Sequence, residues 1–283
     1  MRVDIGGGCR LFFDVAGSGL EPTPDAMQPK PTLLLLHGGP GSDHSSSRPW
    51  FDRFADTHQV IYLDHRGQGR SDDRKDPTGW DLDTWADDVV RFCEALEIER
   101  PVVLGTSFGG FVAIHYAARH PDHPSKLILS STAARRDAAL IESRFAARGG
   151  SEAAASYRRV YVDGDTSPEA WADYARINLP LYGNAPSGFG PRRAWDNHRV
   201  LLHFHDAFFD MDLRAELADI VVPTLVLAGA DDPMTPPELS IEIASLLPEG
   251  LARLEVVDGA GHGTSRDRPE ETERILRDFL APP

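Results

Sequence analysis

The sequence has few cysteines, a shortage of basic residues and no long apolar segment, and each shortage excludes a class of protein. Two cysteines in 283 residues are too few for a disulfide scaffold, and they lack metal-ligand spacing. With 29 Lys and Arg against 44 Asp and Glu, the net charge of -15 argues against nucleic acid or an anionic membrane as a partner. Nowhere do about 18 apolar residues run together, and the N-terminus does not resemble a signal peptide. We therefore predict a cytoplasmic protein that does not enter a membrane.

The apolar segments alternate between strand-length runs and helical patterns. Thr32 to Leu36 is a continuous run suited to a strand covered on both faces, and 81–97 has helical spacing with Asp81 or Asp83 as N-cap. This alternation predicts an α/β protein with a mostly parallel sheet and helices on both faces. Further strands are expected at 10–16, 60–63, 102–104, 126–130, 224–228 and 253–257, a surface loop at 21–31, and a final helix from about Pro269 capped by Asp267 with Glu270.

One segment joins a buried strand to a helix through a sharp turn. Val102 to Leu104 is the strand, Gly105-Thr106-Ser107-Phe108-Gly109 is the turn, and an Ala-rich helix follows. A G-x-S-x-G sequence in this context holds its serine exposed and strained above the sheet, with a helix N-terminus behind it that favours negative charge. We therefore predict that Ser107 is a nucleophile.

A serine hydroxyl needs a base to accept its proton and a third group to orient that base. Among the eleven histidines, His262 lies in a Gly-rich loop directly after a predicted strand, where functional groups are commonly placed. His37 also follows a strand. For the acid, the loop after 225–228 offers Asp232, which is preferred, and Asp231 as the alternative.

The anion that forms on an attacked carbonyl oxygen needs preorganised N–H donors. The backbone N–H of Phe108 directly follows the serine, and Gly39 lies in a His-Gly-Gly-Pro-Gly loop at the end of a predicted central strand. Glycine lets a backbone amide approach a ligand closely. We predict that Gly39 and Phe108 form the oxyanion hole.

The pattern of the chain changes between residues 133 and 220. Ala- and Arg-rich helical stretches with an aromatic cluster replace the alternation of strands and helices, which resumes at Pro223. We predict a core domain of residues 1–132 and 221–283, with 133–220 as a helical cap inserted after the serine turn, over the active-site edge. The alternative is a second core unit.

Five motifs occur in order along both halves of the predicted core, and together they resemble an α/β-hydrolase of the proline iminopeptidase group. They are HGGPG at 37–41, DxRGxGxS at 64–71, GTSFGG at 105–110, GADDP at 229–233 and GAGH at 259–262. The resemblance implies the α/β-hydrolase fold, a helical cap, no cofactor, and a triad of Ser107, Asp232 and His262. The order serine, acid, histidine favours His262 over His37.

Aminopeptidase members of that group bind the substrate's ammonium with cap glutamates, and the matching positions here are Asp173 and Asp196. Because aspartate is shorter by about one C–C bond, both a proline aminopeptidase and an esterase, lactonase or amidase remain open. The expected partner is a small molecule or short peptide, with the number of subunits left open. A non-catalytic small-molecule receptor is the alternative function. No metal site is predicted, since His203 and His205 are two residues apart on a helix.

Overall fold

The structure is a computed structural model that describes residues 1–185 and 194–282, except the side chains of 206, 207 and 209. Within these residues the main sheet has eight strands. They are β1 (Arg2–Asp4), β2 (Arg10–Ala16), β5 (Thr32–Leu36), β6 (Gln59–Leu63), β7 (Val102–Thr106), β8 (Lys126–Ser130), β9 (Thr224–Gly229) and β10 (Ala252–Val257).

The strands are ordered β1-β2-β6-β5-β7-β8-β9-β10 across the sheet. β1 pairs antiparallel with β2, and β2 pairs antiparallel with β6. From β6 to β10 every neighbouring pair is parallel. The prediction of a mostly parallel sheet is confirmed, and the carboxyl ends of its central strands therefore meet at one edge.

Alternate residues of the central strands feed two apolar cores, one on each face of the sheet. Leu34 and Leu36 belong to the core shared with α1 (Leu82–Ala95), α2 (Phe108–Arg119) and α6 (Pro237–Leu246). Leu33 and Leu35 belong to the core shared with α8 (Pro269–Leu280). Because successive side chains of a strand point to opposite faces, a sheet covered on both sides requires an uninterrupted apolar run.

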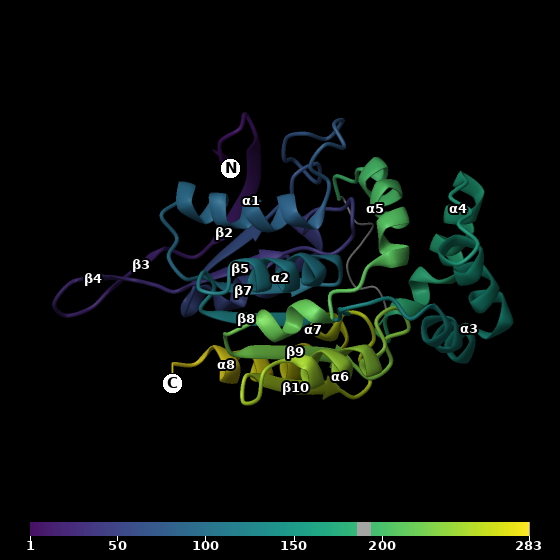
Figure 1. Ribbon diagram of the computed structural model, residues 1–283. Helices are drawn as coiled ribbons and strands as arrows, with labels where there is room; N and C mark the ends of the chain where they lie inside the picture. The colour runs from purple at the N-terminus through teal and green to yellow at the C-terminus, as the bar shows by residue number, and fades with distance from the viewer. Residues whose placement is uncertain (186–193, 283) are drawn as a thin grey trace.

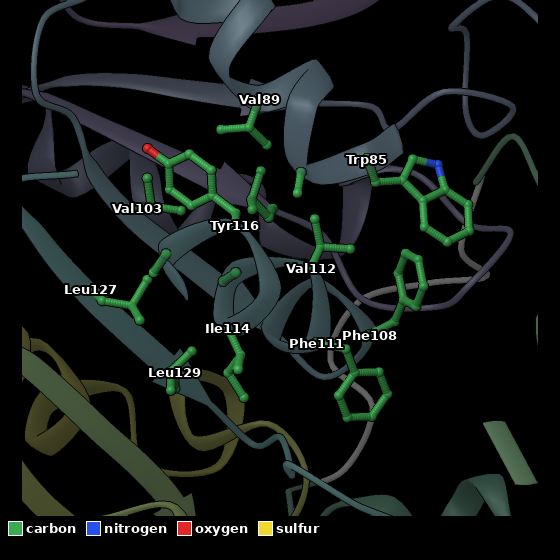
Figure 2. Packing of buried hydrophobic residues seen from close by; sticks show 14 of the residues in the cluster. Trp85, Val89, Val103, Phe108, Phe111, Val112, Ile114, Tyr116, Leu127 and Leu129 are labelled. Carbon is green, nitrogen blue, oxygen red and sulfur yellow. The ribbon is translucent and has the colours of Figure 1, made fainter. Parts of the chain in front are cut away.

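The contact between α1 and α2 anchors the start of α2. Asp81, one of the two predicted caps, accepts a hydrogen bond from Thr84 N at 2.7 Å and begins α1. Trp85 is fully buried, and its ring meets that of Phe108 edge-on with centroids 5.1 Å apart, as Figure 2 shows. Cys93 is also fully buried in α1, where burial raises the pKa of its thiol to about 12. The thiol therefore contributes packing rather than reactivity.

Two local predictions are wrong. The expected surface loop contains a small hairpin of β3 (Leu20–Pro22) and β4 (Met27–Pro29), which projects from the sheet in Figure 1. The proline content of the segment favoured a loop, so the pairing of these two strands was not predicted. Asp267 does not cap α8, whose N-cap is Arg268 without a side-chain hydrogen bond. Its carboxylate instead accepts the N–H of Gly261 at 2.8 Å, which draws it toward the preceding loop.

Between β8 and β9, the described residues form three α-helices. They are α3 (Ala138–Tyr161), α4 (Pro168–Ile177) and α5 (His198–Asp210). In Figure 1 they lie beyond the end of the sheet that is opposite the β3–β4 hairpin. The described part of this region adds to the main sheet no strand of its own, and residues 186–193 of the predicted cap lie outside the described residues. No helix in the described ranges combines the length and apolar character that a membrane span requires.

His115 of α2 lies between two carboxylates from separate elements. Its Nδ1 is 2.8 Å from Glu216 Oε2, and its Nε2 is 2.6 Å from Asp83 Oδ1. The hydrogen bond to Glu216 is the largest of the causes that raise the pKa of His115. The folded protein thus favours the protonated ring. Its contribution to stability is complete below the unfolded pKa, about 6.5, and is lost as the pH rises through the raised folded pKa.

Substituting His115→Gln is expected to lower the free energy of unfolding more at pH 5.5 than at pH 9. The loss at pH 5.5 should be on the order of 0.5–1 kcal/mol, the size typical of a partly exposed ion pair. Urea unfolding of both proteins at the two pH values measures the difference, and Glu216→Gln provides a matched variant. An equal loss at both pH values would contradict the assignment.

Candidate active site

Ser107 occupies the turn between β7 and α2. Its backbone has φ 53° and ψ -118°, a conformation that a residue with a side chain adopts only under strain. Ser107 N–H donates to Ser130 O at 3.0 Å, and Thr132 Oγ1 donates to Ser107 O at 2.8 Å. A Cβ at position 109 would collide with Leu36 O of β5, so Gly109 is required where α2 crosses the sheet. The surrounding contacts therefore hold the serine in its strained turn.

Asp232 and His262 meet from two loops at the same edge of the sheet. Asp232 follows β9, His262 follows β10, and His262 Nδ1 lies 2.8 Å from Asp232 Oδ2. Because an ionised carboxylate only accepts hydrogen bonds, Nδ1 carries the proton and Nε2 of the neutral ring is left as the basic nitrogen. The Asp232 side chain is fully buried, and its Oδ1 accepts the N–H groups of Met234 at 2.8 Å and Thr235 at 3.0 Å.

Asp232, rather than its neighbour Asp231, contacts His262. Asp231 Oδ2 accepts a hydrogen bond from Asn184 Nδ2 at 2.6 Å. Thr235 adds a contact that sequence reasoning missed: its Oγ1 donates to Asp232 Oδ2 at 2.7 Å and lies 3.2 Å from His262 Nδ1. A threonine three residues after an aspartate in a loop is a recognisable local hydrogen-bonding pattern and could have indicated this contact.

The loop that carries His262 is held by the segment around Tyr182. His262 N–H donates to Tyr182 O at 2.6 Å, and the two rings meet edge-on with centroids 5.2 Å apart. Asp267 accepts the N–H groups of Gly261 at 2.8 Å and Asn184 at 2.9 Å. Burial acts to raise the pKa of Asp267, but these backbone hydrogen bonds outweigh it and lower the pKa. An ionised carboxylate therefore joins the two segments.

The glycine-rich loop after β5 passes close to Ser107. A Cβ on Gly38 would lie 3.2 Å from Ser107 Cβ, so this close approach favours a residue without a side chain. Gly39 has φ +138°, which also favours glycine. Within the described ranges, the N–H groups of Gly39 and Phe108 donate to no other group. Both predicted oxyanion donors therefore retain the capacity to bind a ligand oxygen.

A cavity that opens to solvent is lined in part by Ser107. Thr235, which contacts both Asp232 and His262, also lines it. The other lining side chains are mostly apolar or aromatic, and none of the described lining residues is Asp, Glu, Lys or Arg. They include Phe111, Tyr161, Leu201, Phe204, Phe208 and Met234. Burial raises the pKa of Tyr161, which keeps its phenol neutral. The cavity is suited to an uncharged group.

The structure does not bring Asp173 and Asp196 to the described lining of this cavity. Asp173 is half-exposed on α4 and forms ion pairs with Arg159 at 3.3 Å and Arg176 at 3.1 Å. Asp196 is exposed just before α5. Two arginines already balance the charge of Asp173, which weakens it as a partner for a substrate ammonium.

Asn197, the residue after Asp196, has a structural role. Asn197 N–H donates to Gly41 O at 2.5 Å, and Asn197 Nδ2 donates to Gly67 O at 2.7 Å and Arg74 O at 2.9 Å. The buried amide therefore attaches the start of α5 to the glycine-rich loop. Sequence reasoning missed Asn197, and the one signal for it was its position next to Asp196, a predicted substrate-binding residue.

The described residues contain no group of three His, Cys, Asp or Glu side chains placed to hold a metal ion. In the stretch where His203 and His205 occur, His205 Nε2 is 2.9 Å from Val160 O. The side chain of Asp206, the third ligand-type residue of that stretch, lies outside the described residues.

Comparisons with known proteins support the fold described above. A family model described as the alpha/beta hydrolase fold matches residues 31–269. RutD of Azorhizobium caulinodans, a proposed carbamate hydrolase, is 27% identical over 279 residues, which cover 97% of this chain and 96% of that protein. The proline iminopeptidase PfmaB of Pestalotiopsis fici is 26% identical, with 95% of this chain and 98% of that protein covered.

A solved structure shows the same fold. The proline iminopeptidase of Mycobacterium smegmatis superimposes with a TM-score of 0.74 at 24% identity, covering 99% of this chain and 97% of that one. The family match spans most of the chain, including both loops that carry Asp232 and His262. The chain therefore belongs to the α/β-hydrolase family.

Proposed function

We propose that this hydrolase is a cofactor-independent serine hydrolase that cleaves a small, uncharged ester, lactone or amide through an acyl-enzyme. The observation that carries the proposal is the 2.8 Å contact between His262 Nδ1 and buried Asp232, next to Thr235, which lines the same cavity as the strained Ser107. Nucleophile, base and orienting acid are the three groups that this chemistry requires.

The contacts assign a role to each side chain. Asp232 holds His262 in the tautomer whose Nε2 is free to accept the Ser107 proton as Oγ attacks the substrate carbonyl. The imidazolium then donates this proton to the leaving group, and the acyl group stays on Ser107. Water attacks the acyl-enzyme in a second round, with His262 again accepting and returning a proton. Thr235 supports Asp232 through its hydroxyl.

At each step, attack on the carbonyl carbon places a negative charge on the carbonyl oxygen, and this charge requires stabilisation. The N–H groups of Gly39 and Phe108 are the proposed donors, and the N-terminal end of α2 adds a favourable field. Phe108 is fixed in this position because its ring packs edge-on against Trp85 and Phe204. Such donors act without reorganisation during the reaction, which makes them effective.

The cavity supports a neutral acyl group more than an N-terminal prolyl group. An ammonium buried among Phe111, Phe204 and Phe208 would lose its hydration, and the described lining offers no carboxylate to compensate. Helix α3 contributes Tyr161 to this lining, and α5 contributes Leu201, Phe204 and Phe208. We accordingly propose that residues 133–220 act as a cap that shapes the acyl site.

Covalent labelling is the direct test of the proposed nucleophile. A fluorophosphonate probe is expected to label the wild-type protein once, at Ser107, and p-nitrophenyl butyrate should be hydrolysed. Ser107→Ala should abolish labelling and reduce kcat by about 10⁴-fold or more, since the nucleophile is removed. Thermal unfolding checks that the variant is folded. A wild-type protein that binds small acyl compounds without labelling or turnover would instead indicate a receptor.

Two adjacent aspartates provide a matched test of the acid. Asp232→Asn is expected to reduce kcat by about 10⁴-fold, because an amide beside Nδ1 favours the wrong histidine tautomer. Asp231→Asn should change kcat by less than about threefold, as its carboxylate bonds to Asn184 instead of His262. Steady-state kinetics with p-nitrophenyl butyrate separate the two. Comparable losses in both variants would overturn the assignment.

Substrate charge is tested with two esters of matched shape. The p-nitrophenyl ester of butyrate should have a kcat/KM about 100-fold above that of β-alanine, in which an ammonium replaces the terminal methyl group. Proline p-nitroanilide should be a poor substrate as well. Asp173→Asn and Asp196→Asn serve as controls and should leave both esters unaffected. Preference for the ammonium ester, with a higher KM in either variant, would restore the aminopeptidase alternative.

A further inference from the structure

His37 directly follows β5 at the start of the glycine-rich loop, and the mechanism above does not use it. Its side chain is almost entirely buried, and both ring nitrogens have partners. Nδ1 lies 2.7 Å from Gly38 O, and Nε2 lies 3.3 Å from the backbone N of His65. A carbonyl oxygen can only accept, so Nδ1 is the protonated nitrogen, and Nε2 accepts the N–H of His65. The two contacts define one neutral tautomer.

The hydrogen bond to Gly38 O fixes the direction of the next N–H group. The peptide between Gly38 and Gly39 is planar and trans, so its C=O and N–H point in opposite directions. Holding the carbonyl on the His37 side therefore directs the Gly39 N–H to the other side. Gly38 lies against Ser107, because a Cβ added to Gly38 would be only 3.2 Å from Ser107 Cβ. Gly39 lines the cavity.

The same loop is also held at its far end. Gly41 N–H donates to Gln68 Oε1 at 2.7 Å, and Gly41 O accepts the N–H of Asn197 at 2.5 Å. Between these anchors, glycine at 38 and 39 has a wide range of backbone conformations available. One peptide in a flexible stretch would sample several orientations, and a donor that must reorganise stabilises an oxyanion poorly. The His37 contact supplies the missing restraint.

We propose that His37 is a positioning residue for the oxyanion hole: its Nδ1–H holds Gly38 O, and this orients the Gly39 N–H toward the oxygen of the carbonyl group whose carbon Ser107 attacks. His65 N–H in turn keeps the His37 ring in the required tautomer. The inference rests on the proposed hydrolase function. Burial lowers the pKa of His37, in keeping with a ring that stays neutral.

Two amide substitutions separate the two ring nitrogens. His37→Asn places an NH2 group close to the position of Nδ1 and can still donate to Gly38 O. His37→Gln places its amide near Nε2, where it can satisfy His65 N–H but leaves Gly38 O without its donor. We expect His37→Asn to retain kcat within about threefold, and His37→Gln to lose about 10- to 100-fold in kcat with little change in KM.

An inhibitor pair distinguishes positioning from general damage. A trifluoromethyl ketone forms a tetrahedral adduct with an oxyanion, whereas the corresponding methyl ketone binds largely as the ground state. Affinity for the fluorinated ketone should fall in His37→Gln by the same factor as kcat, with affinity for the methyl ketone unchanged. His58→Asn, at another buried histidine, is the control and should affect neither ligand. Equal effects of both His37 variants, or an unchanged inhibitor affinity, would overturn the proposal.

The wild-type protein allows a test that does not depend on variants. Long-range ¹⁵N spectra should show His37 protonated at Nδ1 alone, and the Gly39 amide proton should move downfield when the fluorinated ketone binds. An Nε2–H tautomer, or an unperturbed Gly39 amide in the adduct, would contradict the proposal.

If Ser107→Ala keeps its activity, the proposed hydrolase function itself is wrong. If only the His37 predictions fail, that function is unaffected.

Discussion

The strained backbone of Ser107 depends on how closely α2 crosses the sheet. Position 109 meets the Leu36 carbonyl of β5 so tightly that no side chain fits, and Thr132 holds the Ser107 carbonyl from the next strand. The cost of a strained residue, about 1–3 kcal/mol, is offset by the packing on both sides of it, including the buried Trp85–Phe108 contact. The chain can therefore present a hydroxyl above the sheet without a flexible loop.

Parallel pairing brings the remaining groups to the same edge. β5, β7, β9 and β10 all run in one direction, so the loops that follow them open on one side. Each of three loops carries one residue of the proposed triad: Ser107 follows β7, Asp232 follows β9 and His262 follows β10. The glycine-rich loop follows β5. This arrangement explains how groups separated by more than a hundred residues reach the same edge of the sheet.

The buried carboxylates at this edge accept hydrogen bonds, and the described lining of the adjoining cavity is mostly apolar. Asp232 is buried but accepts hydrogen bonds at both oxygens, and Asp267 is held by backbone N–H groups. The acidic excess of the whole chain does not extend into the described lining of the cavity. Net charge consequently describes the protein's surface, while the proposed substrate preference depends on a few aromatic side chains from α2 and α5.

Much of the architecture could be predicted from the sequence, because apolar periodicity reports burial directly: β5 begins and ends at the predicted residues, and Asp81 caps α1 as expected. Sequence also indicated the turn at Ser107, since glycine spacing and its flanking elements are local. Tertiary structure decided which aspartate contacts His262, because Asp231 and Asp232 are adjacent and side-chain direction depends on packing. It also decided that Asp173 pairs with Arg159 and that Asn197 joins α5 to the core, because these partners are distant in the sequence and meet only through packing. The direction of the His37 ring toward Gly38 O was likewise decided by packing, because the rotamer of a buried ring depends on the residues around it.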